Sequence, residues 1–373
     1  MIMLGIDGRL ANAEQRSGAG RFCWEVLHAL GYMVDSGVRL RVYLDRPPLP
    51  EFNPPRATLI TLPSGPFWTH RILAGELQTQ PTDVFFSPVT QLPWGCPIPS
   101  LVSVLDLAVC SHPAYFPWQK RLAMRLQTAH AVRRANHLLA ISESTARDLR
   151  RYYGVGADRL TVAHPGCAEA FFEAKPAPPA TGTILDTVPD RYILYVGQMQ
   201  PRKNLARLLD AYAQVCERHP DLPHHLVLAG GKGWQNEALF LATSTSPVAD
   251  RIHYLDFLPE EHLPALVAGA DVLVLVSLWE GFGLPALEAM AAGTAVLASN
   301  VSSLPEVVGD AGVLVDPEDT DAIAGGLTRL LTDAAFRFIC EQQGRARARR
   351  FRWASTAAAI VEAVKKLAAD RQR

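Results

Sequence analysis

Residues 277–293 read SLWEGFGLPALEAMAAG, and this stretch decides the fold class. It continues the apolar run DVLVLVS of residues 271–277, which is typical of a parallel strand buried on both faces. The two glycines that follow predict a turn, and Pro285 suits the first turn of a helix, where its missing N–H costs nothing. Gly293 is a typical C-terminal cap for that helix. A buried strand, a glycine turn and a helix in this order indicate an α/β fold.

Strand-like and helix-like segments alternate along the whole chain of 373 residues, which indicates mainly parallel sheets. In the first half we expect strands at residues 2–7, 38–44, 83–87, 100–106 and 137–142, and helices at 19–33, 67–79, 117–135 and 143–152. In the second half we expect strands at 191–197, 224–230, 251–255, 271–277, 294–299 and 312–316, and helices at 203–218, 261–269, 284–292 and 320–333.

The chain is too long for one typical core and suits two domains. Residues 162–183 are rich in Pro, Ala and Gly and indicate an interdomain connection. We therefore expect an N-terminal domain at 1–165, a C-terminal domain at 166–350 and a last helix at 351–373. Two α/β domains of similar size leave a cleft between them, and open α/β sheets bind ligands beyond the carboxyl ends of their strands.

Composition excludes several classes of protein. The formal net charge of −1 does not favour a nucleic acid partner. The 6 cysteines form no C-x-x-C pair and no zinc-type cluster, so we expect free thiols in a reducing cytoplasm. The N-terminus lacks the pattern of a signal peptide, and no apolar run reaches the roughly 18 residues of a spanning helix. We expect a cytoplasmic protein that is soluble or lies on a surface.

Two carboxylates flank the glycine turn. Glu280 stands at the strand end, and Glu288 lies about one turn into the helix. The N–H groups of the turn and of the helix N-terminus suit a phosphate group, and the two acids suit hydroxyl groups on either side of it. A nucleotide sugar has this layout of ribose, diphosphate and sugar. The alternative is that Glu288 is a solvated helix residue and that the glycines only form a turn.

A second candidate stretch is YVGQMQPRKN, residues 195–204. Arg202 and Lys203 stand just before a helix, where adjacent cations are unfavourable for the helix dipole. An anion bound between them would remove this conflict, and a departing diphosphate is such an anion. The alternative is a solvated charge pair. A third stretch, SGAGRF at 17–22, resembles a phosphate-binding turn before the first helix, although it lacks a full dinucleotide fingerprint.

Together these features resemble the retaining GT-B glycosyltransferases of family 4. Four separated motifs match in order and spacing, and the resemblance covers essentially the whole chain. The motifs are EGFGLPALEAMAAGTAVLAS, GQMQPRKN, LAGGKGW and LPEVVGDAGVLVDPED. The resemblance implies two Rossmann-like domains facing a cleft, an N-terminal acceptor domain, a C-terminal nucleotide-sugar donor domain, and a last helix that crosses back to the N-terminal domain.

The resemblance also implies roles for single residues. Arg202 and Lys203 would hold the donor diphosphate, Glu280 would contact hydroxyls of the transferred sugar, and Glu288 would hold the ribose. The other donor-binding positions are Gly18, Gly20, Gly197, Gly230, Gly231, Leu258, Phe282, Gly283 and Leu284. No cofactor is implied beyond the donor itself. Metal dependence is not expected, because the D-x-D of Asp319 and Asp321 resembles a helix start.

One position departs from the family pattern. The family usually has a His in an H-D-L context where this sequence has Leu105 before Asp106. One hypothesis is that Leu105 packs on the methyl group of a 6-deoxy sugar such as rhamnose. Alternatively, His112 on the same loop replaces the missing His, although a purely local role suits it better. Asp106 is the best polar candidate near the acceptor and is included among the catalytic residues.

The resemblance implies transfer of a hexose, mannose-like or a 6-deoxyhexose such as rhamnose, from a nucleotide diphosphate sugar to a saccharide or a lipid-linked saccharide. We expect front-face displacement rather than a covalent intermediate. Eight Lys or Arg residues in the region 117–151 suggest contact with an anionic membrane, and a solvated basic face is the alternative. Two other functions stay open. One is a nucleotide-sugar 2-epimerase of the same architecture, and the other is a non-catalytic protein that binds nucleotide sugars.

Overall fold

The computed structural model describes residues 1–33, 37–176, 183–231, 233, 237–256 and 258–371. The chain divides into two compact units. Unit 1 contains Met1–Gly166 and Arg352–Arg373, and unit 2 contains Cys167–Phe351. Residues 177–182 of the expected connection, and Lys232 and Trp234 of the LAGGKGW motif, lie outside the described residues.

Unit 1 is built on a sheet of seven parallel strands in the order β3-β2-β1-β4-β5-β6-β7. The strands are β1 (Ile2–Asp7), β2 (Val38–Leu44), β3 (Ala57–Thr61), β4 (Val84–Ser87), β5 (Ser100–Val104), β6 (His137–Ala140) and β7 (Leu160–Val162). The sequence analysis missed β3 and β7. These are the two edge strands: β3 is only partly buried and β7 has three residues, so neither carries the long apolar run of a central parallel strand.

The helices of unit 1 follow the expected pattern with small shifts, except that α3 was not expected. They are α1 (Gly18–Tyr32), α2 (Ala74–Thr79), α3 (Ala108–Ser111), α4 (Trp118–Arg134), α5 (Glu143–Tyr153) and α14 (Trp353–Arg371). The helix expected at 67–79 begins as a π-helical turn, η1 (Thr69–Leu73), before it continues as α2. Helix α5 starts where the Ser142 side chain accepts a bond from the Thr145 N–H, and it ends at Gly154 with φ of 64°.

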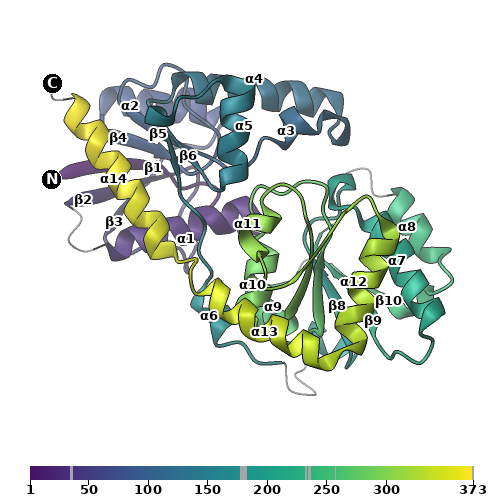
Figure 1. The fold of residues 1–373 in the computed structure, drawn as a ribbon. Helices are drawn as coiled ribbons and strands as arrows, with labels where there is room; N and C mark the ends of the chain where they lie inside the picture. Colours follow the sequence, from purple (N-terminus) through teal and green to yellow (C-terminus); the bar gives the residue numbers. More distant parts are fainter. Residues whose placement is uncertain (34–36, 177–182, 232, 234–236, 257, 372–373) are drawn as a thin grey trace. The chain divides into compact units, whose positions relative to one another are not determined.

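The last helix, α14, is part of unit 1 and packs beside α1 (Figure 1). The Trp353 ring lies 5.8 Å from the Phe22 ring of α1, measured between centroids. The Thr356 hydroxyl donates to the His164 carbonyl at 2.5 Å. Gly166 passes so close to Trp353 that an added Cβ would lie 2.1 Å from the Trp353 nitrogen. Unit 1 is therefore completed by a segment from the other end of the sequence.

Unit 2 is built on a sheet of six parallel strands in the order β10-β9-β8-β11-β12-β13. The strands are β8 (Tyr192–Val196), β9 (His225–Ala229), β10 (Ile252–Leu255), β11 (Val272–Leu275), β12 (Ala295–Ser299) and β13 (Val313–Val315). The helices are α6 (Glu169–Phe172), α7 (Leu205–Arg218), α8 (Glu237–Ser244), α9 (Leu263–Gly269), α10 (Leu284–Ala292), α11 (Leu304–Val308), α12 (Thr320–Thr332) and α13 (Ala334–Ala348). Six strands of this unit were expected from the sequence, whereas the helices α6, α8, α11 and α13 were not.

In both sheets the order of the strands reverses at one point. This point lies between β1 and β4 in unit 1 and between β8 and β11 in unit 2. The loops that leave neighbouring strands at such a point diverge and open a site at the carboxyl ends of the strands. The expected α/β class with parallel sheets is confirmed. Among the described residues, no helix is both long and apolar enough to cross a membrane.

Candidate active site

Glycines end two central strands of unit 2 because the backbones there approach closely. Gly230 follows β9 with φ of 137°, and an added Cβ would lie 2.2 Å from the Gly197 carbonyl oxygen. Gly197 follows β8 with φ of 150°, and its N–H donates to the Ala229 carbonyl. Gly231 has open space at its Cβ position, and Leu258 lies buried beyond β10. These four predicted donor-binding residues therefore lie at the carboxyl ends of three adjacent strands.

Arg202 and Lys203 lie in a short 3-10 turn, η5 (Pro201–Lys203), that precedes α7. Asn204 sits between this turn and the helix in a left-handed conformation, with φ of 61°. Its side-chain amide donates to the carbonyls of Val276, at 3.1 Å, and Pro317, at 2.6 Å. The amide thereby ties the cationic turn to the loop that follows β11.

The carboxylate of Glu280 lies between these two cations. The Lys203 Nζ atom is 2.5 Å from Glu280 Oε1, and the Arg202 Nη1 atom is 3.2 Å from Glu280 Oε2. The Ser277 hydroxyl donates to Oε1 at 2.7 Å, and Arg202 also donates to the Trp279 carbonyl at 2.9 Å. Arg202, Lys203 and Glu280, predicted from stretches 77 residues apart, thus form one cluster, which we call the charge cluster.

The charge cluster corrects one step of the sequence argument. No external anion is required to relieve the adjacent cations, because Glu280 supplies a negative charge from within the chain. The alternative of a solvated charge pair is also wrong, since the side chains of Lys203 and Glu280 are each only 9% exposed. Burial raises the pKa of Glu280, but Lys203 and Arg202 outweigh it and bring that pKa to about 2. The carboxylate is therefore ionised at neutral pH.

The turn after β11 is held by two serines that the sequence analysis missed. The Ser302 hydroxyl accepts from the Glu280 N–H, and the Ser303 hydroxyl donates to the carbonyls of Glu280 and Phe282. Gly283 precedes α10 with φ of 104°, a conformation that favours glycine. The only signal for the serines was their place in the loop after the next strand, β12.

Helix α10 (Leu284–Ala292) has the bounds expected from the sequence and carries Pro285 in its first turn. Its C-terminal cap is Gly293, with φ of 81°. Glu288 is 3% exposed, so the alternative that it is a solvated helix residue is wrong. Phe282 and Leu284 flank the helix start, where the first N–H groups of a helix have no partner within it. The turn, the helix start and both acids are therefore consecutive parts of one segment of unit 2, with both acids buried.

The glycines predicted in unit 1 do not form a turn before the first helix. Gly18 is the first residue of α1, and Gly20 lies within its first turn. An added Cβ at Gly20 would lie 2.9 Å from the Leu10 carbonyl oxygen, which gives this glycine a packing role, whereas Gly18 has open space. Their approach to donor phosphates stays a prediction.

Asp106 and His112 both have local partners in unit 1. Asp106 accepts a bond from the Ala108 N–H at 3.0 Å and so begins α3. The His112 Nδ1 atom lies 3.0 Å from the Ser111 hydroxyl, and its ring stacks on Tyr115. Leu105 is half-buried beside Asp106. A role for Asp106 near an acceptor stays a prediction.

The described residues contain no group of three or more His, Cys, Asp or Glu side chains that could hold a metal ion. Asp319 accepts a bond from the Ala322 N–H at 2.9 Å and caps α12, so the D-x-D pattern forms a helix start.

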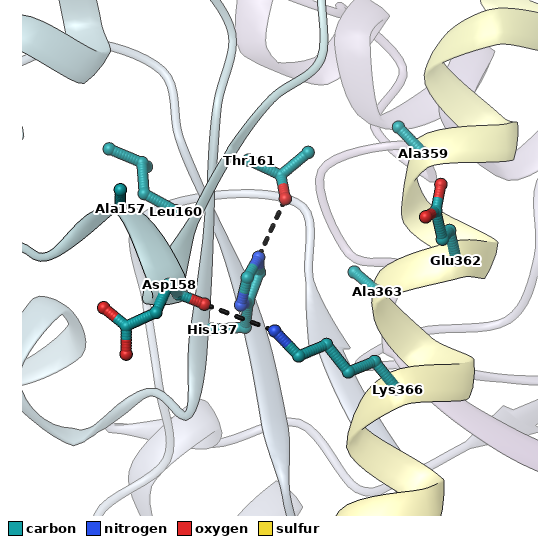
Figure 2. A pocket seen from close by; sticks show the side chains of 9 residues that line it. All are labelled: His137, Ala157, Asp158, Leu160, Thr161, Ala359, Glu362, Ala363 and Lys366. Atoms are coloured by element: carbon teal, nitrogen blue, oxygen red, sulfur yellow. Dashed lines mark hydrogen bonds between the residues drawn. The ribbon is translucent and has the colours of Figure 1, made fainter.

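A pocket of about 300 Å³ lies elsewhere in unit 1, between α14 and the amino ends of β6 and β7 (Figure 2). His137 Nε2 lies 2.9 Å from the Thr161 hydroxyl, and Lys366 donates to the Asp158 carbonyl at 3.4 Å. Because His137 and Leu160 are the first residues of their strands, this pocket is at the opposite end of the sheet from the loops that carry chemistry in such folds.

Comparison with known proteins agrees with this architecture. The description Glycosyl transferases group 1 matches residues 185–347, and Glycosyltransferase Family 4 matches residues 16–170. The O-antigen chain mannosyltransferase B of Escherichia coli is 34% identical over 265 residues, which cover 70% of this chain and 69% of that protein. The serotype-specific mannosyltransferase WbdA of Escherichia coli is 32% identical over 246 residues, but these cover 64% of this chain and only 30% of that protein.

Among solved structures, sucrose-phosphate synthase from Thermosynechococcus elongatus matches 99% of this chain and 100% of its own, with a TM-score of 0.77 and 22% identity. Two parallel Rossmann-like sheets with this match define the GT-B class of glycosyltransferases. The chain belongs to glycosyltransferase family 4, as its four motifs indicated. It is a transferase that uses a sugar donor.

Proposed function

We propose that this protein transfers a hexose from a nucleotide diphosphate sugar to a saccharide or lipid-linked saccharide, with retention of anomeric configuration. The observation that carries the proposal is the charge cluster, in which Arg202 and Lys203 lie against Glu280 beside the start of α10. Two cations and a helix N-terminus suit a diphosphate, and a carboxylate among them suits sugar hydroxyls. Glu288, one turn along α10, holds the ribose.

The donor must displace part of the charge cluster when it binds. The diphosphate takes the positive charge of Arg202 and Lys203, and the Glu280 carboxylate is then released to accept bonds from hydroxyls of the transferred sugar. Ser302 and Ser303 keep the Glu280 backbone in place during this exchange, while Ser277 donates to its carboxylate. The ion pair of the free protein therefore presents the same groups that the donor uses.

In the reaction, the bond between the anomeric carbon and the diphosphate oxygen breaks, and its electron pair leaves with the diphosphate. An acceptor hydroxyl forms the new bond on the same face, and its proton passes to a departing phosphate oxygen. Arg202 and Lys203 stabilise the charge that develops on the diphosphate. This route uses no metal ion and no covalent sugar–carboxylate intermediate.

Two relatives bear on the choice of sugar, since both are named as mannosyltransferases. We propose a mannose-type donor first and a 6-deoxyhexose such as rhamnose second. The second choice is supported by the apolar Leu105 before Asp106. An apolar contact discriminates weakly between a methyl and a hydroxymethyl group, so side-by-side kinetics with both donors separate the two choices.

Helix α4 supports a peripheral position on an anionic membrane, which would be the inner face of the cytoplasmic membrane. Trp118, Leu122 and Leu126 repeat every four residues along the helix and are 66%, 54% and 64% exposed. Cationic side chains lie beside them at Lys120, Arg121 and Arg125. Apolar residues flanked by cations are typical of helices that lie in a membrane interface. The fraction of protein that sediments with anionic vesicles should fall at high salt and in the variant Leu122→Glu. A protein that sediments with neither anionic nor neutral vesicles would refute this position.

The central experiment is a thermal-shift panel of nucleotide diphosphate sugars, followed by transfer assays with the stabilising donor. Ligand that binds the folded chain raises its stability with ln(1 + [L]/Kd), so the true donor stands out. Transfer to a saccharide that persists in EDTA, with an NMR coupling constant showing retention, supports the proposal. Conversion of the donor without an acceptor would indicate an epimerase, and binding without any turnover would indicate a non-catalytic protein.

A further inference from the structure

An aromatic group on unit 1 lies outside the residues assigned above. The indole ring of Trp94 stacks on the imidazole ring of His70, with centroids 4.3 Å apart and planes 20° from parallel. His130 of α4 meets His70 edge-on, at 6.4 Å between centroids. We call Trp94, His70 and His130 the ring platform. It joins the loop after β4, the π-turn after β3 and one helix.

The ring platform presents an open aromatic face. Trp94 is 56% exposed, although one face of its ring lies against His70. Its other face is therefore open to solvent. Phe67, three residues before His70, is 66% exposed and has φ of 54°. A large aromatic side chain held in an exposed position is typical of binding sites.

Within the ring platform and at the neighbouring Trp68, three buried nitrogen atoms lack hydrogen-bond partners. His70 Nδ1, His130 Nε2 and Trp68 Nε1 are buried and have no hydrogen-bond partner in the structure. Buried polar atoms normally have a partner, and a missing one costs free energy. Burial first, and then the neighbouring His130 and Arg9, lower the pKa of His70. His70 therefore packs on Trp94 as a neutral ring, and its buried Nδ1 atom is not exposed to a ligand.

The loops beneath the platform are fixed by Arg9. Its guanidinium bonds to Asp7 at 2.9 Å and to Gln91 at 3.0 Å, contacts the Thr69 hydroxyl, and lies 4.5 Å from the Trp68 ring centroid. Asp7 ends β1 and Gln91 follows β4, so Arg9 spans the switch point of the sheet. The segments that carry Trp94 and His70 are thereby held in place before any ligand arrives.

We infer that the ring platform is a subsite for a pyranose ring. A pyranose has a face of C–H groups that packs on an aromatic ring and a rim of hydroxyls that both donate and accept hydrogen bonds. The open face of Trp94 matches the first, and a sugar stacked there keeps its rim of hydroxyls in contact with water. The inference rests on the proposed function, in which that saccharide is the acceptor.

The test measures saccharide binding in the absence of donor. Saturation-transfer NMR with a panel of disaccharides and trisaccharides of mannose, rhamnose, glucose and galactose identifies the bound sugar, and titration gives its Kd. In Trp94→Ala, Kd should rise about three- to tenfold or more, the loss of one aromatic stacking contact. Trp94→Phe should keep most of the affinity, and His70→Ala should lose it. Tyr32→Ala removes another exposed aromatic residue of unit 1 as the matched control.

Two results would overturn the inference: no saccharide of the panel binds, or one binds with the same Kd in Trp94→Ala. The inference would also be overturned if the protein bound lipid vesicles through Trp94 and bound no saccharide. Donor stabilisation in the thermal-shift panel is measured separately with the same variants. A donor response that survives in Trp94→Ala, without saccharide binding in any variant, rejects the platform and leaves the proposed transferase standing.

Discussion

The Nζ atom of Lys203 lies 2.5 Å from the Oε1 atom of Glu280, with both side chains buried. In the protein without donor, this ion pair neutralises a cation that the proposed mechanism assigns to the diphosphate. The carboxylate and the diphosphate therefore compete for Lys203 and Arg202. If Glu280 loses its charge, diphosphate binding should therefore be kept or strengthened, whereas turnover should fall.

Glu280→Gln removes the competing charge and keeps the shape of the side chain. We expect the nucleoside diphosphate that corresponds to the true donor to bind at least as tightly as in the unchanged protein, while kcat falls about 10²-fold or more because the sugar loses its carboxylate. Calorimetry of the diphosphate and initial rates of transfer measure the two effects. Glu318→Gln, at an exposed position of unit 2, is the control. Clearly weaker diphosphate binding would contradict the competition.

Lys203→Ala removes a preorganised cation. We expect kcat to fall by about 10²-fold or more, as for the loss of one group that stabilises developing charge. Because the change also leaves Glu280 buried with only Arg202, stability should fall by about 3–5 kcal/mol. Thermal melting must show that the variant is folded at the assay temperature. Near-normal turnover in a folded variant would refute the diphosphate clamp.

Gly230→Ala tests the close approach of the loops after β8 and β9. An added Cβ would lie 2.2 Å from the Gly197 carbonyl, at a φ of 137° that side chains rarely adopt. We expect a loss of about 1–3 kcal/mol in the free energy of unfolding, measured by urea titration. Gly325→Ala lies in α12 with open space around it and should be neutral or stabilising by up to about 1 kcal/mol. If both variants changed the free energy of unfolding equally, the close contact between Gly230 and the Gly197 carbonyl would not be what requires a glycine.

Asp148→Asn tests a buried acid on α5. Burial raises the pKa of Asp148 to about 6, and its Oδ2 atom has no hydrogen-bond partner. Since the folded pKa is raised, the folded state binds the extra proton, and the stability gained from protonation is lost as pH rises through about 6. At pH 7.5, Asp148→Asn should therefore be more stable by about 1–2 kcal/mol, allowing for partial screening by solvent.

That difference should shrink as pH falls below 6 and disappear below about pH 3, where Asp148 is protonated in both the folded and the unfolded state. Urea titrations across this range provide the measurement, with Asp158→Asn at an exposed position as the control. A pH-independent difference would rule out the ionisation of Asp148 as its cause.

The central strands and α10 could be predicted from sequence because their signals are local. A run such as DVLVLVS is apolar throughout, and Pro285 with Gly293 sets the two ends of the helix. The edge strands β3 and β7 lack that run, because one side of an edge strand meets no neighbour. Helix α13 was missed because it starts at once after α12, at the Asp333 cap, with no loop to separate the two.

The site shows the same division. Arg202, Lys203, Glu280 and Glu288 stand in recognisable motifs, so the sequence alone was enough to propose them as site residues. Their mutual contact could not be predicted, because it depends on how β8 and β11 pair across the sheet. Asn204, Ser302 and Ser303 act through hydrogen bonds to residues that are distant along the chain. The sequence around a short polar side chain does not predict which distant residue it will bond to.

The return of α14 to unit 1 has a consequence for biosynthesis. The ribosome makes residues 1–166 first, then the continuous segment of unit 2, and the helix that packs on α1 only afterwards. Until α14 emerges, nascent unit 1 leaves apolar side chains such as Phe22 without the Trp353 ring that later packs beside them. Because of this order of synthesis, unit 2 can finish folding before unit 1. Chaperones that bind apolar surface would therefore bind unit 1 during synthesis.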